Sequence, residues 1–382
     1  MVEQLHHFDR ITREALTRIL GCPVGERAWL QARLPVADGG LGLRAAANHA
    51  PAAYASSVLA AQPLSDRLLG HDFAGLNPDD PLLPQSLLDR LSAEQGELVQ
   101  EEDVNGVSQK QLSWKIDQHL LKALQEQIGE EEMREKARLL SLGLPHCGDW
   151  LNTPPLKALG LHLRPSEFVL ATKYRLGLPL YEQEGPCPAC RRLSDVLGDH
   201  AMSCGTGGER IARHNHLRDA IFALASAAGL APIKEGRFLL PGDDRRPADV
   251  FIPYWAGGLD AALDVTVVNP LQDATLAGAS TSPGHALTFA HDRKVRGAEE
   301  DCRRQGIAFL PLAVESFGGW HDSAQREVKK VAVALARHTG QEEAEACHHA
   351  WSRLGILLQR GNSAILANRV PSHPSPAVDD IV

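Results

Sequence analysis

The chain has little of what marks secreted, membrane-spanning or disulfide-stapled proteins. Its seven cysteines in 382 residues are too few and too unevenly spread for a disulfide framework. No stretch approaches the run of about 18 apolar residues that a transmembrane helix needs, and the first residues, MVEQLHHFDRITRE, contain no apolar signal core. We therefore expect an intracellular protein, in the nucleus or the cytoplasm, with no membrane partner.

The chain also has no excess of basic residues. Its formal net charge of −9 argues against a protein that coats nucleic acid by bulk electrostatic attraction. Any contact with DNA must therefore be confined to a local surface. The apolar content of 43 % is high enough for a buried core, and the length allows two or three domains.

Two nucleotide-related motifs are absent as well. The turn Gly39-Gly40-Leu41-Gly42-Leu43 lacks the Gly-Lys-Ser/Thr ending of a phosphate loop, so it predicts a connection between helices. The chain has no aromatic-x-Asp-Asp polymerase hairpin, because Pro241-Gly242-Asp243-Asp244 is typical of a turn. These absences exclude a P-loop enzyme and a polymerase.

Residues 1–145 are expected to be mainly helical. The first segment, 1–70, has apolar residues at helical spacing, and 71–108 is broken by prolines and an acidic cluster, which favours an exposed linker. A long helical pattern from 109 to 142 has one apolar stripe, which indicates packing into a core rather than a partner-binding helix. The apolar residues of the first segment are Phe8, Ile11, Ala15 and Ile19, and the acidic cluster is Glu97, Glu101, Glu102 and Asp103. The apolar stripe of the long helical pattern is Leu112, Ile116, Leu120, Leu124 and Ile128.

Residues 146–206 contain a linker and then a compact cysteine and histidine cluster. Cys187, Cys190, His200 and Cys204 follow the pattern Cys-x2-Cys-x9-His-x3-Cys, whose ligand types and spacing are typical of a structural Zn²⁺ site in a small zinc knuckle. The alternative is four unrelated residues with buried thiols. A zinc ion in a reducing compartment is the better interpretation of three cysteines so close together.

The following region, 207–335, changes its hydrophobic period. A helix is expected over 207–228 and another over 285–304. Strands are expected over 233–240, 248–254, 261–268 and 307–314. The order α-β-β-β-α-β predicts an α+β domain with a mixed sheet that helices cover on both sides. Residues 336–382 are expected to form a C-terminal helix and a disordered tail.

Acidic residues occur on three successive strand-like segments of this region. Asp264 alternates with the aliphatic Leu263 and Val265, Asp249 begins the preceding strand, and Glu235 lies on the strand before that. If these strands pair, the carboxylates converge and can hold one Mg²⁺ or Mn²⁺ ion, which would activate water for attack on a phosphodiester. The alternative is that each acid merely ends a strand or caps a loop.

The order of these elements resembles a known family. The run CPAC…GDHAMSC…RIARHN…RRPADV…LDVTVVNP…HDRK…FLPLAVESFGGW, over roughly residues 150–320, resembles the C-terminal region of site-specific non-LTR retrotransposon proteins. That region combines a CCHC zinc knuckle with a restriction-enzyme-like PD-(D/E)xK endonuclease. The segment 1–70, with WLQARLP and GGLGLR, resembles the part just after the polymerase in such polyproteins.

The resemblance implies roles for particular residues. It places the zinc ligands on the four cluster residues, and the catalytic acids on Asp249 and Asp264. It places a DNA-contacting motif on Arg213, His214 and Asn215.

The chain departs from the family pattern at two positions. Ala248 separates Pro247 from Asp249, and Thr266 stands where a lysine is expected. In the family that lysine can come from the following helix, which points to Lys294.

These observations predict a metal-dependent DNA endonuclease of retrotransposon origin, with DNA as the partner and the RNA of the element as a second candidate partner. Two alternatives remain open. One is a catalytically inactive nucleic-acid-binding or scaffold protein that keeps the fold, and the other is a helical interaction protein with no nucleic-acid role, which the net charge would suit.

Overall fold

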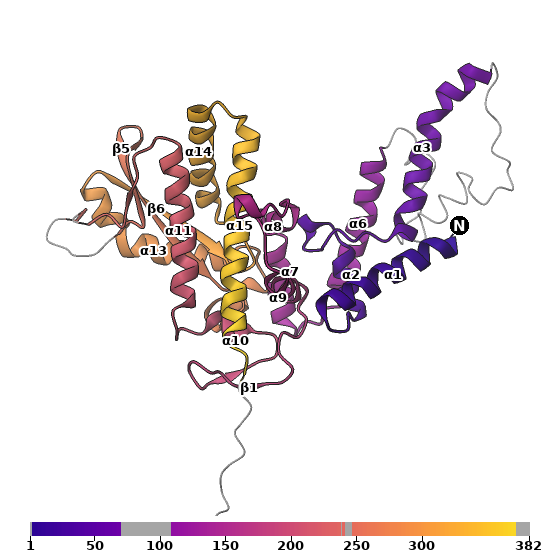
Figure 1. Ribbon diagram of the computed structural model, residues 1–382, viewed down its shortest axis with the longest axis horizontal. Helices are drawn as coiled ribbons and strands as arrows, with labels where there is room; N and C mark the ends of the chain where they lie inside the picture. Colours follow the sequence, from indigo (N-terminus) through magenta and orange to yellow (C-terminus); the bar gives the residue numbers. More distant parts are fainter. Residues whose placement is uncertain (1, 70–107, 238, 241–246, 372–382) are drawn as a thin grey trace, which may run out of the picture. The chain divides into compact units, whose positions relative to one another are not determined.

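A computed structural model of the chain describes residues 2–69, 108–237, 239–240 and 247–371. The chain divides into two compact units, Met1–Gly129 and Glu130–Val382, which are coloured along the sequence in Figure 1. Helix α7 (Met133–Leu142) packs on helix α12 (Asp273–Ala279). For this reason α7 belongs to the second unit, although the sequence analysis grouped it with residues 1–145.

The first unit is helical throughout its described part. It begins with α1 (Val2–Leu20), α2 (Glu26–Arg33), η1 (Val36–Asp38) and α3 (Ala46–Leu69), and it ends with α6 (Gln109–Glu126). The apolar stripe expected after residue 109 is buried from Leu112 to Ile128, which confirms its assignment to a core. A capping box formed by Ser108 and Gln111 starts α6, because each side chain satisfies a backbone N–H of the other residue.

The glycine-rich turn connects helices, as expected. Gly39 has a φ of 86°, in the left-handed region that suits glycine. A Cβ atom on Gly40 would lie 1.9 Å from the carbonyl oxygen of Leu34. The glycines therefore allow the backbone to pass close to the end of α2, and the turn needs no ligand to explain its composition.

The first apolar stripe faces the other way from what its spacing indicated. Phe8, Ile11 and Ile19 are 57 %, 47 % and 57 % exposed, whereas Leu16 and Leu20 are buried. The spacing correctly predicted a helix. It could not identify the inward face, because α1 has apolar residues on more than one side.

The second unit contains one four-stranded sheet, a small two-stranded sheet and the helices around them. Before the large sheet come α7, α8 (Asp149–Asn152), η2 (Lys157–Leu159), α9 (Pro165–Leu176), β1 (Gly185–Pro186), β2 (Leu193–Ser194), α10 (Asp199–Ser203) and α11 (Glu209–Ala227). The remaining elements are β3 (Ile233–Lys234), β4 (Val250–Ala256), β5 (Leu259–Val268), α12, α13 (His285–Arg304), β6 (Ile307–Glu315), α14 (Asp322–Thr339) and α15 (Glu343–Ala367).

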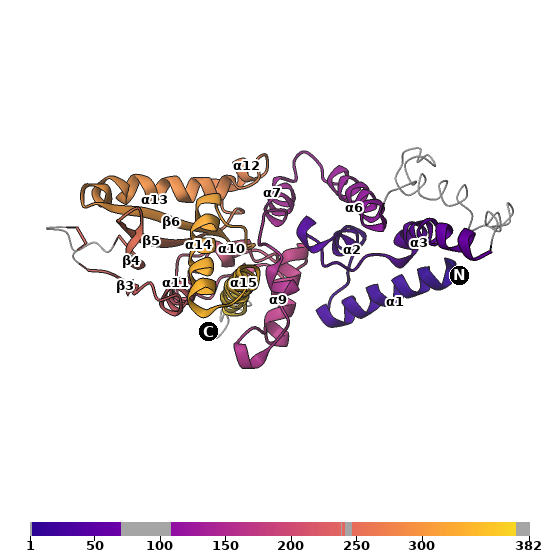
Figure 2. The ribbon, with the colours of Figure 1, turned by 90° about the horizontal axis from the view of Figure 1, so that it is seen from above.

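The large sheet is mixed, as predicted. Its order is β3-β4-β5-β6, with the first two pairs antiparallel and the pair β5–β6 parallel. Seen from above, α12 and α13 lie on one side of the sheet, and α11, α14 and α15 lie on the other (Figure 2). The α+β class is therefore confirmed. The order of elements is as predicted except that α12 precedes α13, and the strand expected over 233–240 is described only as β3 (Ile233–Lys234).

The alternation along β5 divides its side chains between these two layers. Leu263 and Val265 are buried in the core that includes α11, α14 and α15, whereas Val268 packs with residues of α13. Helix α15 contributes Leu354 and Leu358 to the first core. It is thus an integral layer of the second unit rather than an appendage beyond residue 335.

Some expectations lie outside the described residues. These are the acidic cluster from Glu97 to Asp103, the turn at 241–244 and the tail after Pro371. In the part of the chain that the structure describes, no helix is both long and apolar enough to cross a membrane.

Candidate metal and carboxylate sites

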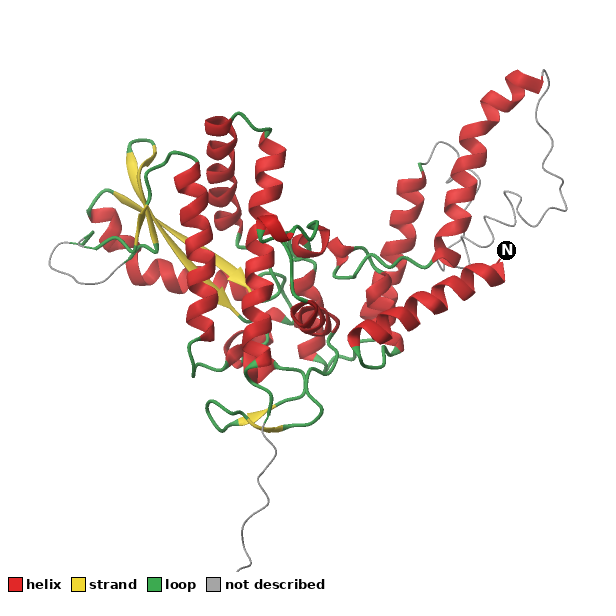
Figure 3. Ribbon diagram, in the orientation of Figure 1, coloured by secondary structure: helices red, strands yellow, loops and turns green. Residues whose placement is uncertain are grey.

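The cysteine and histidine cluster is assembled from a hairpin and a short helix. Cys187 and Cys190 lie in the turn between β1 and β2, His200 lies on α10, and Cys204 directly follows that helix. The turn is closed by hydrogen bonds from Cys187 N–H to the carbonyl of Arg192 (2.8 Å) and from Arg191 N–H to the carbonyl of Cys187 (2.9 Å). Most of the module around it is loop (Figure 3), as expected for a fold held by a metal ion.

The four ligand atoms converge. All lie within 4.8 Å of one another, and His200 Nε2 is 3.2 Å from Cys190 Sγ. In the described residues this is the one group of three or more histidine, cysteine or acidic ligand atoms so close together. Four ligands around Zn²⁺, at about 2.0 to 2.3 Å each, require separations of this size, so the set fits one tetrahedral ion.

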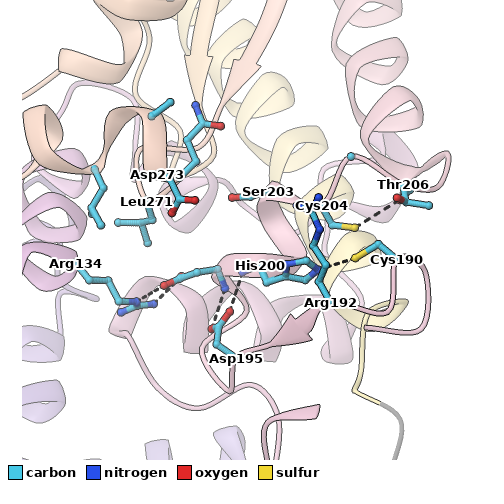
Figure 4. Close-up of a pocket in the computed structure, with 15 residues that line it drawn as sticks. Arg134, Cys190, Arg192, Asp195, His200, Ser203, Cys204, Thr206, Leu271 and Asp273 are labelled. Carbon is cyan, nitrogen blue, oxygen red and sulfur yellow. Dashed lines mark hydrogen bonds and ion pairs between the residues drawn. The ribbon is translucent and has the colours of Figure 1, made fainter. Parts of the chain in front are cut away.

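Carboxylates orient the short helix that carries His200. Asp195 accepts hydrogen bonds from the backbone N–H groups of Leu197, Asp199 and His200, at 2.9, 3.1 and 2.8 Å. Asp199 does not orient the neighbouring imidazole but forms an ion pair with Arg134 on α7. Figure 4 shows His200 and Cys190 directed toward each other, with Asp195 beneath the helix.

The cluster borders a cavity and is fixed to the large sheet. The cavity, of about 1000 Å³, lies between the module and α12 and is lined by Arg192, Ser203 and Asp273 among others. Asn269, just after β5, donates a hydrogen bond from Nδ2 to Ser203 Oγ at 3.0 Å. The module is therefore connected to the strand that carries Asp264.

The two aspartates meet where β4 begins beside β5. The backbone N–H of Asp249 donates to the carbonyl of Leu263 at 2.9 Å. Its carboxylate Oδ2 accepts from the backbone N–H of Val265 at 2.7 Å. These two partners flank Asp264, so Asp249 is held against that position by its backbone and its side chain together.

Asp264 is a buried acid with one cationic partner. Its Oδ2 lies 2.7 Å from Lys294 Nζ, on α13, although the contact lacks hydrogen-bond geometry. Burial raises the pKa of Asp264, Lys294 opposes this rise, and the charge of Asp249 adds to it.

A lysine contacts Asp264 from another element and not from its own strand. Thr266, two residues after Asp264 on the same strand, is buried. Lys294 approaches Asp264 from α13, the second helix after β5. The structure thus brings together three of the expected residues, Asp249, Asp264 and Lys294.

His214 and Glu235 take separate positions around this group. His214 Nε2, from α11, lies 3.1 Å from Asp249 Oδ1, so this residue of the expected DNA-contacting motif instead meets an acid. Glu235 has a φ of 49°, and its carboxylate forms an ion pair with Arg218. Its backbone N–H donates to the carbonyl of Asp249 at 2.9 Å.

Arg213 does not lie at a surface that DNA could reach. It is only 3 % exposed, and its Nη1 donates a hydrogen bond to Asn362 Oδ1 on α15 at 2.7 Å. Burial lowers its pKa to about 10. The phosphate contact that the resemblance implied is therefore not assigned to Arg213, which connects α11 to α15. Asn215 is partly buried on the same helix.

Sequence reasoning missed several residues of these sites. Arg218, which binds both Asp219 and Glu235, had no motif to mark it. Asn269 had none either, yet its Oδ1 accepts from the Ser316 hydroxyl at 3.1 Å while its Nδ2 donates to Ser203, beside the cysteine and histidine cluster. Its position directly after the clearest strand was the available signal.

Comparison with known proteins leaves the chain without an assigned family. No family model matches it, and no curated protein matches it. The case for a function therefore depends on the geometry of the two sites.

Proposed function

We propose that the second unit is a Mg²⁺-dependent DNA endonuclease of retrotransposon type, stabilised by a structural zinc ion. The observation that carries the proposal is the convergence of Asp249, Asp264 and Lys294 at the start of β4 and the middle of β5. A mixed sheet with two acids and a lysine at adjoining positions is the arrangement expected of a PD-(D/E)xK nuclease.

The acidic pair suits a hard divalent cation. Mg²⁺ prefers carboxylate oxygens, and it is usually bound by one or two carboxylates together with water and substrate phosphate. Asp264 Oδ2 is a buried oxygen without a hydrogen bond in the described chain, and its only close partner is the ammonium of Lys294. Burial is the main cause of the raised pKa of Asp264, and the charge of Asp249 adds to it; a second cation between the two acids would offset both effects.

The residues then take distinct tasks in phosphodiester hydrolysis. Asp249 and Asp264 would hold the ion, which when bound polarises the scissile phosphate and lowers the pKa of a water molecule. Lys294 would hold its positive charge beside Asp264 and stabilise negative charge that develops on the phosphate. His214 would fix the orientation of the Asp249 carboxylate through its Nε2 contact.

The four-residue cluster supports the zinc part of the proposal. Three thiols and one imidazole within 4.8 Å are the ligand types that Zn²⁺ favours, and four protein ligands leave no open position for catalysis. The ion would therefore be structural. It would hold the loop-rich module against the end of β5 through Ser203 and Asn269.

A nicking assay tests the proposal. The purified chain should convert supercoiled plasmid to open circles in Mg²⁺ or Mn²⁺ and not without a divalent ion. Lys294→Gln, which removes the charge and keeps a polar side chain one atom shorter, should slow nicking by about 10²-fold or more. Asp292→Asn, a change at an exposed acid on the same helix, is the matched control and should nick at the wild-type rate. Equal rates for all three proteins would contradict the proposal.

The main alternative is a DNA-binding protein without catalysis. The specific observation in its favour is the direct 2.7 Å contact between Lys294 and Asp264, because the ammonium already neutralises the acid that a metal ion would need. A wild-type chain that binds DNA but never nicks it in either metal would establish this alternative.

A further inference from the structure

Helix α14 carries a row of exposed cations on its outer face. Arg326, Lys329, Lys330 and Arg337 are exposed, whereas Val328 and Val331 on the inner face are buried. The helix lies on the side of the sheet opposite α13 (Figure 2). This basic face, defined by Arg326, Lys329, Lys330 and Arg337, therefore lies away from Lys294 and is not part of the carboxylate site.

The basic face borders a cleft whose described lining contains no carboxylate. The cleft has a volume of about 830 Å³, and its lining adds Leu230, Trp255 and His338 to the four cations. The Trp255 indole donates to Glu327 Oε2 at 2.8 Å, and Lys330 binds the other oxygen of Glu327 at 2.7 Å. These bonds hold the indole ring in place, so the lining of the cleft combines a fixed aromatic ring with four cations.

Two of the cations lie on a ridge. Arg326 and Lys329 line this cleft and also a second hollow of about 530 Å³, whose lining includes His146, Trp351 and the carboxylate of Asp322. Neither side chain forms an ion pair with a carboxylate in the described part of the chain. Their charges are therefore available to an external anion.

The remaining two cations have only partial compensation. Lys330 shares Glu327 with Trp255. Arg337 lies 3.3 Å from Glu343, but both side chains are mostly exposed, and an exposed pair of this kind contributes about 1 kcal/mol or less. A phosphate could compete for Arg337 at little cost. The face is thus positive within a chain whose net charge is −9.

We propose that the basic face of α14 binds the phosphate backbone of duplex DNA. Arg326 and Arg337 are eleven positions apart, which at 1.5 Å per residue is about 16 Å along the helix. At 3.4 Å of axis per phosphate on one strand, this length matches about five phosphates. Three of the cations lie within five positions and Arg337 lies two turns further on, so the basic face extends along the helix, which suits a linear polyanion.

This surface would act as a second DNA contact, distant from the scissile phosphate. The choice of DNA as the ligand rests on the proposed nuclease, but binding at α14 does not require cleavage. It would give the protein a local affinity for DNA despite its negative net charge. Backbone contacts of this kind carry no sequence information and fix only the position of the protein on the duplex.

Salt-dependent binding tests the proposal directly. Anisotropy of a labelled duplex, measured with the full chain between about 50 and 200 mM salt without added Mg²⁺, gives the slope of log K against log[salt]. The triple variant Arg326→Gln/Lys329→Gln/Arg337→Gln should make the slope shallower by about 2 to 3, at about 0.9 per lost phosphate contact, and should weaken binding by at least about tenfold.

A matched variant controls for the change in net charge. Lys157→Gln/Arg303→Gln/Arg304→Gln removes the same charge from exposed positions on η2 and α13, and it should leave the slope close to that of the wild type. An unchanged slope in the α14 triple variant, or an equal loss in the control, would overturn the proposal. Lys329→Gln alone should make the slope shallower by about one unit. This single variant keeps the test valid if the triple variant unfolds.

The outcomes separate this proposal from the nuclease. Loss of DNA binding in the α14 variant, with no nicking by the wild type, would leave the DNA surface and remove the nuclease. Nicking by the wild type, together with an unchanged salt slope in the α14 variant, would support the nuclease and remove the DNA surface on α14. Binding of a matched RNA duplex that depends on α14, with no binding of DNA, would overturn the assignment of the ligand as DNA.

Discussion

Replacing Glu315 by glutamine should stabilise the second unit at neutral and alkaline pH. Glu315 ends β6 and is 0 % exposed, and neither of its carboxylate oxygens makes a hydrogen bond in the described chain. Burial raises its pKa from 4.5 to about 7, with a smaller opposing effect of Ser141. An ionised carboxylate in this position is costly because no cation among the described residues pairs with it.

The pKa shift sets both the magnitude and the direction of the effect. The pKa of Glu315 rises from 4.5 to about 7. At about 1.36 kcal/mol per pKa unit, ionising this carboxyl in the folded chain costs about 3 kcal/mol more than in the unfolded chain. The folded chain holds this proton more tightly than the unfolded chain does. The free energy of unfolding therefore falls as pH rises from about 4.5 to 7, and the full loss is present above pH 7.

Glu315→Gln removes the charge at nearly constant volume. Urea unfolding followed by tryptophan fluorescence should show the variant more stable than the wild type by about 3 kcal/mol at pH 8 and by much less at pH 5. Glu299→Gln, at an exposed position on α13, should show no such dependence. An equal difference at both pH values would refute the argument, because Glu315 would then not titrate in this range.

Three further substitutions test the rest of the structure. Cys190→Ser should release about one zinc per chain, measured by elemental analysis, and unfold the module locally. The reason is that zinc binding contributes on the order of 10 kcal/mol to the folding of such modules. Wild-type protein that contains no zinc would contradict the zinc assignment. Gly361→Ala should lower stability by about 1 to 3 kcal/mol in urea, because the new Cβ would lie 2.6 Å from Arg213 Cγ; the gain of about 1 kcal/mol usual in a helix would contradict this packing. Arg213→Met should lower stability and leave the salt slope of DNA binding unchanged, whereas a slope reduced by about one would restore Arg213 as a phosphate contact.

Local patterns predicted the parts of the structure that local physics determines. The spacing of Cys187, Cys190, His200 and Cys204 specified a cluster because a turn and a short helix suffice to bring them together. The alternation around Asp264 specified its strand and the separation of its two faces. The pairing of Asp249 with the residues that flank Asp264 followed from the strand order.

Contacts between distant parts of the sequence were not accessible in this way. Arg213 is buried by Asn362, 149 positions away, so its motif gave no sign that it faces the interior. The prediction of the inward face of α1 was wrong for a related reason, because periodicity identifies a helix but not the neighbouring element that covers it. The unpaired carboxylate of Glu315 depends on packing around β6 that no motif encodes.

The most direct test of the nuclease is the nicking rate of the two aspartate variants, alone and combined. Asp264→Asn and Asp249→Asn should each reduce Mg²⁺-dependent nicking by well over about 10²-fold, because both would remove a ligand of the same ion. The double variant should be little slower than either single one, as expected of residues that act as one unit. Wild-type nicking rates in both single variants would contradict the account.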